Sequence, residues 1–227
     1  MSPSQNSKNS SIWDVVVIGG GASGMMAAGR AAELGKKVLL LEKNTSLGKK
    51  LLITGGGRCN VTNNKTNTRE MLAKYKGNDK FLFSTFSQFD VTSAIEFFKE
   101  RGMAMKEENE GRLFPVSNTA QSVYDVLYTY MRKGGVTIRK SSIVSGIKVT
   151  KGGDSLTIGT KSGNDLLAKS CIVATGGTSR PETGSTGEGF QWLKKLGHTI
   201  VEGDAALVPI ALTDTWVKKA SGNSLDD

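Results

Sequence analysis

The feature that most constrains the fold lies at residues 13–42. The chain reads WDVVVIGGGASG at 13–24, continues through a helical segment, and reaches VLLLE at 38–42. Residues 15–18 form a short, apolar, β-branched run that is typical of a strand buried on both faces. The order of strand, glycine turn, helix, second strand and terminal acid predicts a βαβ unit whose helix covers about 22–34.

The glycine spacing in this unit predicts a turn that binds a dinucleotide. Gly19 allows a sharp turn, Gly21 lets the backbone approach a pyrophosphate, and Gly24 permits close packing of helix against strand. The helix that begins at Ala22 points its free N–H groups and its positive dipole end at that phosphate.

Glu42 lies 18 residues after Gly24, where a carboxylate accepts hydrogen bonds from the ribose hydroxyls of adenosine. A ribose phosphate about 4 Å away would be repelled by about 4 kcal/mol per unit charge at an effective dielectric constant near 20. The spacing therefore predicts FAD or NAD at this site and excludes NADP.

Composition places the chain among ordinary globular proteins. Its 227 residues can bury a sizeable core, and no apolar run reaches the length of a membrane span. Residues 1–12 are rich in Ser, Asn and Lys and lack the apolar stretch of a signal peptide, so we expect a disordered leader. Two cysteines form no disulfide framework, which favours a reducing cytoplasm.

The net charge of +9 raises the question of nucleic acid binding. Six of the cations precede glycines at predicted helix ends, where they interact favourably with the helix dipole. These are Lys99, Arg101, Arg132, Lys133, Lys194 and Lys195. No aromatic residues interleave with a basic run, so nucleic acid is not expected as a partner, and a small-molecule substrate is favoured.

The remaining pattern predicts an α/β, Rossmann-like domain with a parallel sheet, helices and a β-meander. Further helices are expected at 79–86, 90–101, 119–133 and 188–196, and a hairpin at 103–115. A third parallel strand is expected at 136–139, a meander at 143–150, 155–160 and 166–175, and strand-like segments at 198–202 and 206–212.

Two further signatures accompany the first. Residues 48–63 read GKKLLITGGGRCNVTN, in which three glycines expose backbone N–H groups beside the forked cation of Arg58. Such a loop suits an anionic or heteroaromatic ligand, although a flexible surface loop without a ligand could have the same glycine-rich sequence. The segment at 171–177 reads CIVATGG, an apolar strand whose end lies at the edge where open α/β sheets bind ligands.

Together these segments resemble the bacterial flavoproteins related to the bile-acid-inducible N-type reductases, within the two-dinucleotide-binding flavoprotein superfamily. The resemblance is carried by GGGASG, LGKKLLITGGGRCNVTN, GRLFPVSNTAQSV and ATGGTSRPETGSTGEG, spread over about residues 14–212. It implies FAD bound in extended form, reduction by NAD(P)H as a transient electron donor, and hydride transfer to an organic acceptor, in some members a conjugated steroid double bond.

The resemblance also implies which residues bind FAD. Those expected at the pyrophosphate, the ribose and along the cofactor are Gly19, Gly21, Ala22, Ser23, Gly24, Glu42, Lys43, Lys50, Gly56, Gly57, Arg58, Cys59 and Asn60. Val144 is expected to meet adenine through its backbone, and Thr175 and Gly176 to pack near the ADP portion.

Members of this family resemble a split design, in which a second domain interrupts the cofactor domain and a glycine-rich segment closes over the flavin. We therefore expect the N-terminal part of an FAD-binding domain at 13–205 and the beginning of a truncated second domain at 206–227. Two alternatives remain open: a flavoprotein that acts on tRNA, and a truncated FAD-binding module without catalytic activity.

No residue is assigned to catalysis, because the flavin ring supplies the hydride chemistry. Arg58 beside Cys59 could lower the pKa of that thiol, but packing or cofactor lining is the favoured role. Cys171 is expected in the core and His198 at a turn or strand edge. No metal-ligand cluster and no serine nucleophile with a partner histidine is apparent.

Overall fold

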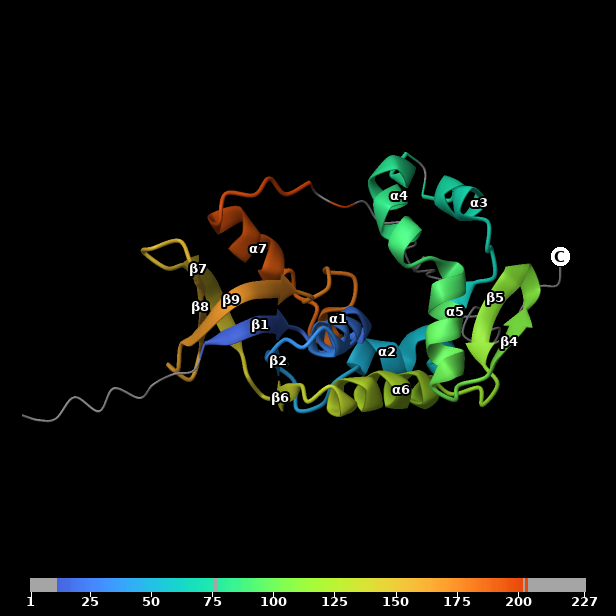
Figure 1. Ribbon diagram of the computed structural model, residues 1–227, viewed down its shortest axis with the longest axis horizontal. Helices are drawn as coiled ribbons and strands as arrows, with labels where there is room; N and C mark the ends of the chain where they lie inside the picture. Colours follow the sequence, from blue (N-terminus) through green and yellow to red (C-terminus); the bar gives the residue numbers. More distant parts are fainter. Residues whose placement is uncertain (1–11, 76, 202, 204–227) are drawn as a thin grey trace, which may run out of the picture.

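A computed structural model describes residues 12–75, 77–201 and 203, and its main element is a mixed six-stranded sheet (Figure 1). The strand order is β6-β2-β1-β9-β8-β7. The strands are β1 (Trp13–Ile18), β2 (Val38–Leu41), β6 (Thr137–Arg139), β7 (Val144–Val149), β8 (Leu156–Thr160) and β9 (Leu166–Val173). β6, β2, β1 and β9 run parallel, while β8 and β7 continue the sheet antiparallel, which confirms the predicted meander.

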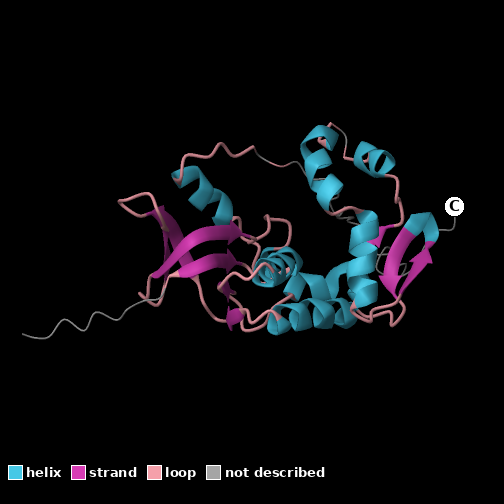
Figure 2. Cartoon of the chain, in the orientation of Figure 1, coloured by secondary structure: helices cyan, strands magenta, loops and turns pink. Residues whose placement is uncertain are grey.

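The described helices surround this sheet and a second, smaller one. They are α1 (Ala22–Glu33), α2 (Lys49–Ile53), α3 (Thr68–Ala73), α4 (Asp79–Gln88), α5 (Val91–Glu100), α6 (Ala120–Lys133) and α7 (Glu188–Lys195). The second sheet is antiparallel, in the order β3 (Thr62–Asn63), β5 (Arg112–Pro115) and β4 (Met105–Glu108). Figure 2 shows the two sheets at opposite ends of the molecule, with α1, α2 and α6 between them.

The core consists of two clusters, one on each face of the main sheet. Successive residues of a strand point to opposite faces, so Val17 and Leu40 join the cluster that packs on α1 and α6. Val16 and Leu39 join the other cluster, which Trp192 of α7 covers. The run at 15–18 is thus buried on both faces, as its composition predicts.

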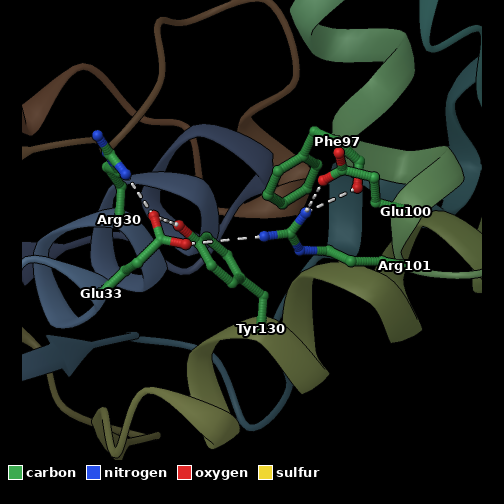
Figure 3. A network of polar contacts seen from close by, with 6 residues as sticks. All are labelled: Arg30, Glu33, Phe97, Glu100, Arg101 and Tyr130. Carbon is green, nitrogen blue, oxygen red and sulfur yellow. Dashed lines mark hydrogen bonds and ion pairs between the residues drawn. The ribbon is translucent and has the colours of Figure 1, made fainter.

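A polar and aromatic network holds α1, α5 and α6 together (Figure 3). The Tyr130 hydroxyl of α6 donates to Oε2 of Glu33 on α1 at 2.8 Å. The guanidinium carbon of Arg101, which ends α5, lies 3.9 Å from the Phe97 ring centroid and 4.7 Å from that of Tyr130. Burial and the Glu33 hydrogen bond raise the pKa of Tyr130 to about 12, so the phenol stays a donor at neutral pH.

One of the two predicted C-terminal strands is absent from the structure, and the other lies outside the described residues. The described part of 198–202 contains no strand, because the backbone there closes α7 instead: the Gly197 N–H donates to the Lys194 carbonyl and the His198 N–H to the Leu193 carbonyl. His198 is exposed in this turn. The segment at 206–212, and with it the predicted second domain, lies outside the described residues. Among the described helices, none is long and apolar enough to cross a membrane.

The packing of α1 on α6 generates a stability prediction at Gly29. A Cβ on Gly29 would lie 2.3 Å from the Tyr130 ring, which Glu33 and Arg101 hold in place. Overpacking costs about 1–3 kcal/mol, whereas helix propensity returns about 1 kcal/mol. We expect Gly29→Ala to lower the free energy of unfolding in urea by up to about 2 kcal/mol, the difference of these terms.

A Tyr130→Ala background provides the control for this prediction. Without the ring, Gly29→Ala should be neutral or stabilising, and the double-mutant cycle isolates the coupling. Equal effects of Gly29→Ala in both backgrounds would contradict the packing account.

Candidate functional site

The glycine turn between β1 and α1 depends on one close contact. A Cβ on Gly24 would lie 1.8 Å from the carbonyl oxygen of Gly19, so only glycine allows α1 to approach β1 this closely. A Cβ on Gly21 would instead meet nothing within 4 Å, although Gly21 caps the helix and lines the cavity described below. The contact between Gly19 and Gly24 therefore shapes the fold, whereas the position of Gly21 leaves open space for a ligand.

Glu42 follows β2 and is fixed from both sides. Its Oε2 accepts the Gly20 N–H at 2.7 Å, and its Oε1 accepts the Asn44 N–H, also at 2.7 Å. The residue is only 7% exposed, yet it lines the cavity. A carboxylate has about four acceptor sites, so acceptor capacity remains for ligand hydroxyls after both amides are bound.

A cavity of about 600 Å³ runs along the carboxyl edge of the parallel strands and collects most of the predicted site. Twelve predicted residues line it: Gly19, Gly21, Ala22, Ser23, Glu42, Lys43, Lys50, Cys59, Asn60, Val144, Thr175 and Gly176. The N-terminus of α1 opens into it without a side-chain cap and without acidic residues in the first turn. Its N–H groups therefore meet an anion without competition from the protein.

Four predicted residues do not line the cavity: Gly24, Gly56, Gly57 and Arg58. Gly24 lies behind the turn, as its packing role requires. The φ angles of Gly55, Gly56 and Gly57 are +59°, +65° and +82°, a left-handed run that explains the three glycines. Contact of Gly56, Gly57 and Arg58 with a cofactor stays a prediction.

Arg58 is engaged by the small sheet. Its Nη1 lies 2.9 Å from both carboxylate oxygens of Glu108, and its guanidinium carbon lies 4.2 Å from the Phe114 ring centroid. The expectation that Arg58 lowers the pKa of Cys59 is therefore wrong. Burial raises the pKa of the Cys59 thiol, because desolvation disfavours the thiolate. Cys59 lines the cavity as a buried, protonated thiol, which agrees with the favoured lining role.

A loop at 183–188 that was not predicted from the sequence lines one end of the cavity. Lys43 Nζ lies 2.7 Å from Oε2 of Glu188 and 2.9 Å from Oγ1 of Thr186, while the Asn44 amide donates to the Thr183 carbonyl at 3.1 Å. The Lys43 hydrogen bond lowers the pKa of Glu188. The glycine- and threonine-rich stretch at 175–189 signalled this loop, but its partner could not be read from the sequence.

The other end of the cavity is apolar. It is formed by Phe89 after α4, Phe98 of α5, and Val123 and Leu127 of α6. Each of these residues except Phe89 is buried. One continuous cavity therefore joins a polar end with a helix N-terminus and a carboxylate to an apolar end with aromatic rings.

The residues present fit FAD. The cavity volume lies within the range of small-molecule and cofactor sites. The α1 N-terminus suits the pyrophosphate, and the fixed Glu42 carboxylate suits the ribose diol. Half-buried Ser142, exposed Ile143 and buried Val144 line the same cavity, where adenine is expected.

This arrangement defines the class of the protein as an α/β, Rossmann-like FAD-binding fold. The model of the HI0933-like protein Rossmann domain matches residues 13–211, and the chain belongs to this family of FAD-binding Rossmann domains.

Two curated proteins show how the family diverges. The chain is 32% identical to the ribosomal RNA dihydrouridine synthase of Escherichia coli (strain K12) over 200 residues, or 88% of this chain and 48% of that protein. It is 33% identical to the 3-dehydro-bile acid delta(4,6)-reductase of Clostridium scindens over 213 residues, or 92% of this chain and 50% of that protein. The chain thus spans about half the length of the curated relatives that it matches.

Two solved structures share the fold at low identity. Thermovibrio ammonificans THI4 superposes with a TM-score of 0.53 at 19% identity, covering 82% of this chain and 64% of that one. The 3-ketosteroid-delta4-(5alpha)-dehydrogenase of Rhodococcus jostii RHA1 gives a TM-score of 0.55 at 15% identity, covering 78% and 49%. At these identities the likeness shows the fold alone.

The turn geometry predicts opposite effects for two alanine substitutions. Gly21→Ala should fold with stability near that of the unsubstituted chain, because its methyl group meets open space, but it should weaken FAD binding about tenfold or more by crowding the pyrophosphate. Gly24→Ala should lower stability itself, since its methyl group would collide with the Gly19 carbonyl. Melting curves and flavin titrations separate the two; undiminished FAD affinity of Gly21→Ala would contradict the site.

The thiols provide a second prediction. Burial raises the pKa of Cys59 above its ordinary value and that of Cys171 to about 12, so little thiolate exists at pH 8. We expect a disulfide reagent to label both cysteines slowly in the folded chain and rapidly in denaturant. Cys59→Ser and Cys171→Ser variants assign the two rates; rapid labelling of folded Cys59 would restore the activated-thiol interpretation.

Proposed function

We propose that this chain binds FAD in the cavity described above and serves an oxidoreductase that passes electrons from NAD(P)H to an organic acceptor. The observation that carries the proposal is the joining, in one cavity, of the uncapped α1 N-terminus, the fixed Glu42 carboxylate and an apolar aromatic end. When bound, FAD supplies the two-electron redox chemistry, and the protein supplies position and electrostatics.

The names of the two relatives suggest one reaction type. A dihydrouridine synthase saturates the ring double bond of a uracil base, and a delta(4,6)-reductase saturates double bonds of a 3-dehydro bile acid. Both acceptors are alkenes conjugated to a carbonyl group. We infer that the acceptor here belongs to the same chemical class, and that reduction adds a hydride to one alkene carbon and a proton to the other.

In this proposal, each part of the cavity wall has a different role in binding FAD. The α1 N–H groups bind the pyrophosphate charge, and Glu42 orients the ribose and disfavours a 2′-phosphate. The Lys43–Glu188 pair holds the 183–188 loop over the polar end. At the apolar end, Phe89, Phe98 and Leu127 exclude water from a flat ring. No described residue is assigned a catalytic proton transfer.

The proposal predicts a flavin spectrum. The purified chain should be yellow or take up added FAD, and its absorbance near the flavin maximum should bleach on anaerobic addition of NADH or NADPH. A preparation that stays colourless and does not take up FAD would contradict FAD binding, and a bound flavin that neither nucleotide reduces would contradict the donor.

Glu42→Gln tests the ribose contact within the same assay. Hydrogen bonds to charged groups are worth about 1.5–3 kcal/mol, so FAD affinity should fall about 10- to 150-fold. Glu182→Gln is the matched control, because this glutamate is exposed and does not line the cavity.

A further inference from the structure

A hollow lies between α3 and α4, which together form the α3–α4 hairpin, and the FAD cavity does not use it. Figure 1 shows the two helices beside each other, above α5 and away from the main sheet. The Tyr75 and Phe86 rings meet edge to face with centroids 6.0 Å apart, which fixes the helices against each other. The hollow has a volume of about 500 Å³, within the range of small-molecule sites.

The lining of the hollow combines two cations, one acid and one aromatic ring. Arg69 of α3 and Lys80 of α4 line it together with the ring of Phe83 and buried Leu72. Asp79 lines it from the first turn of α4. Within the described part of the chain, neither Arg69 nor Lys80 forms an ion pair. The hollow therefore offers two cations to an anion, one acceptor to a hydroxyl group and one ring face to a flat group.

The helix α4 connects this hollow to the FAD cavity. Phe89 ends α4 and lines the apolar end of the cavity. At a rise of about 1.5 Å per residue, Phe83 lies about 9 Å and Lys80 about 14 Å from Phe89 along the helix axis. A ligand made of two joined nucleotides is long enough to extend from the apolar end along α4 to the hollow.

A 2′-phosphorylated electron donor needs free cations away from the polar end of the cavity, because Glu42 disfavours a 2′-phosphate there. Two arginines lie within three residues of the cavity lining, but Arg58 and Arg101 already form ion pairs with carboxylates. Arg69 and Lys80, at the far end of α4, are not engaged in this way. The described charges thus favour the hollow as the place where such a phosphate binds.

We propose that the hollow binds the 2′-phosphorylated adenosine of NADPH, which makes NADPH rather than NADH the electron donor. Arg69 and Lys80 bind the 2′-phosphate, Asp79 accepts the remaining ribose hydroxyl, and Phe83 stacks on adenine. A forked guanidinium matches phosphate oxygens, and an aromatic ring stacks on any base. The inference rests on the proposed function for the role of NADPH as donor, whereas binding of the 2′-phosphate does not require FAD.

Isothermal titration calorimetry with adenosine 2′,5′-bisphosphate tests the hollow without turnover, using the full chain with and without FAD. We expect it to bind about 10- to 150-fold more tightly than adenosine 5′-monophosphate, which lacks the 2′-phosphate. Arg69→Ala and Lys80→Ala should each remove much of this preference. Phe83→Ala should instead weaken both ligands about 5- to 150-fold and leave the preference intact, while Phe83→Trp should preserve binding.

Matched controls lie on the same hairpin outside the hollow. Lys74→Ala removes an exposed cation, as Lys80→Ala does, but Lys74 does not line the hollow. Phe81→Ala removes a ring that is 84% exposed and also does not line it. Both should leave the affinity for the bisphosphate unchanged. Thermal melting of each variant shows whether a loss of binding is a loss of folding.

Anaerobic reduction of bound FAD connects the hollow to the cavity. NADPH should reach half of its maximal reduction rate at a lower concentration than NADH does. Arg69→Ala should raise this concentration for NADPH about 10- to 150-fold. The value for NADH and the affinity for FAD should not change, since neither involves the 2′-phosphate.

Three results would overturn the inference. They are equal affinities for the bisphosphate and the monophosphate, equal effects of the hollow and control variants, or binding of adenosine 3′,5′-bisphosphate as tight as that of the 2′,5′ isomer. The last would assign the hollow to another phosphorylated adenosine. FAD uptake without binding of the 2′,5′-bisphosphate defeats only this inference, and binding of the bisphosphate without FAD uptake defeats the proposed function but leaves the phosphate site in place.

Discussion

The contact between Gly24 and the Gly19 carbonyl is the constraint on which the site depends. A Cβ placed 1.8 Å from that oxygen is impossible, so the sequence must have glycine there for α1 to leave β1 at this angle. That angle points the α1 N-terminus into the cavity. Glu42 then fixes the intervening turn by accepting the Gly20 N–H, which ties the end of β2 to the start of the helix. The uncapped N-terminus of α1 and the Glu42 carboxylate are therefore parts of one rigid unit, whose ordering cost is met during folding.

The opposite wall of the cavity is held more weakly. Lys43 and Glu188 lie 145 residues apart in the chain and form an ion pair whose side chains are 27% and 40% exposed. Pairs with this exposure contribute about 0–1 kcal/mol, so the pair positions the loop at 183–188 more than it stabilises the fold.

The sequence predicted the elements whose determinants are local. The glycine turn, α1, β2 and Glu42 lie within 30 residues, and each follows from spacing and apolar pattern alone. The hairpin of β4 and β5 and the meander were likewise found from turn residues between apolar runs. Contacts between distant segments could not be predicted this way: Arg58 pairs with Glu108 across 50 residues, and burial raises the pKa of Cys59, which was expected to be lowered. The strand predicted to begin at His198 does not form there, because the His198 N–H donates to the Leu193 carbonyl at the end of α7.

An aromatic chain connects the α3–α4 hairpin to the locked core. The Phe89 ring meets Phe97 with centroids 6.5 Å apart, and Phe97 in turn meets Phe98 at 5.2 Å and Tyr130 at 5.0 Å. Phe98 lines the cavity, while Tyr130 belongs to the network that joins α1 and α6. Close-packed rings move little without moving their neighbours, so these contacts hold the end of α4 against the wall of the cavity. The α3–α4 hairpin is thus packed against the cavity through a chain of aromatic rings.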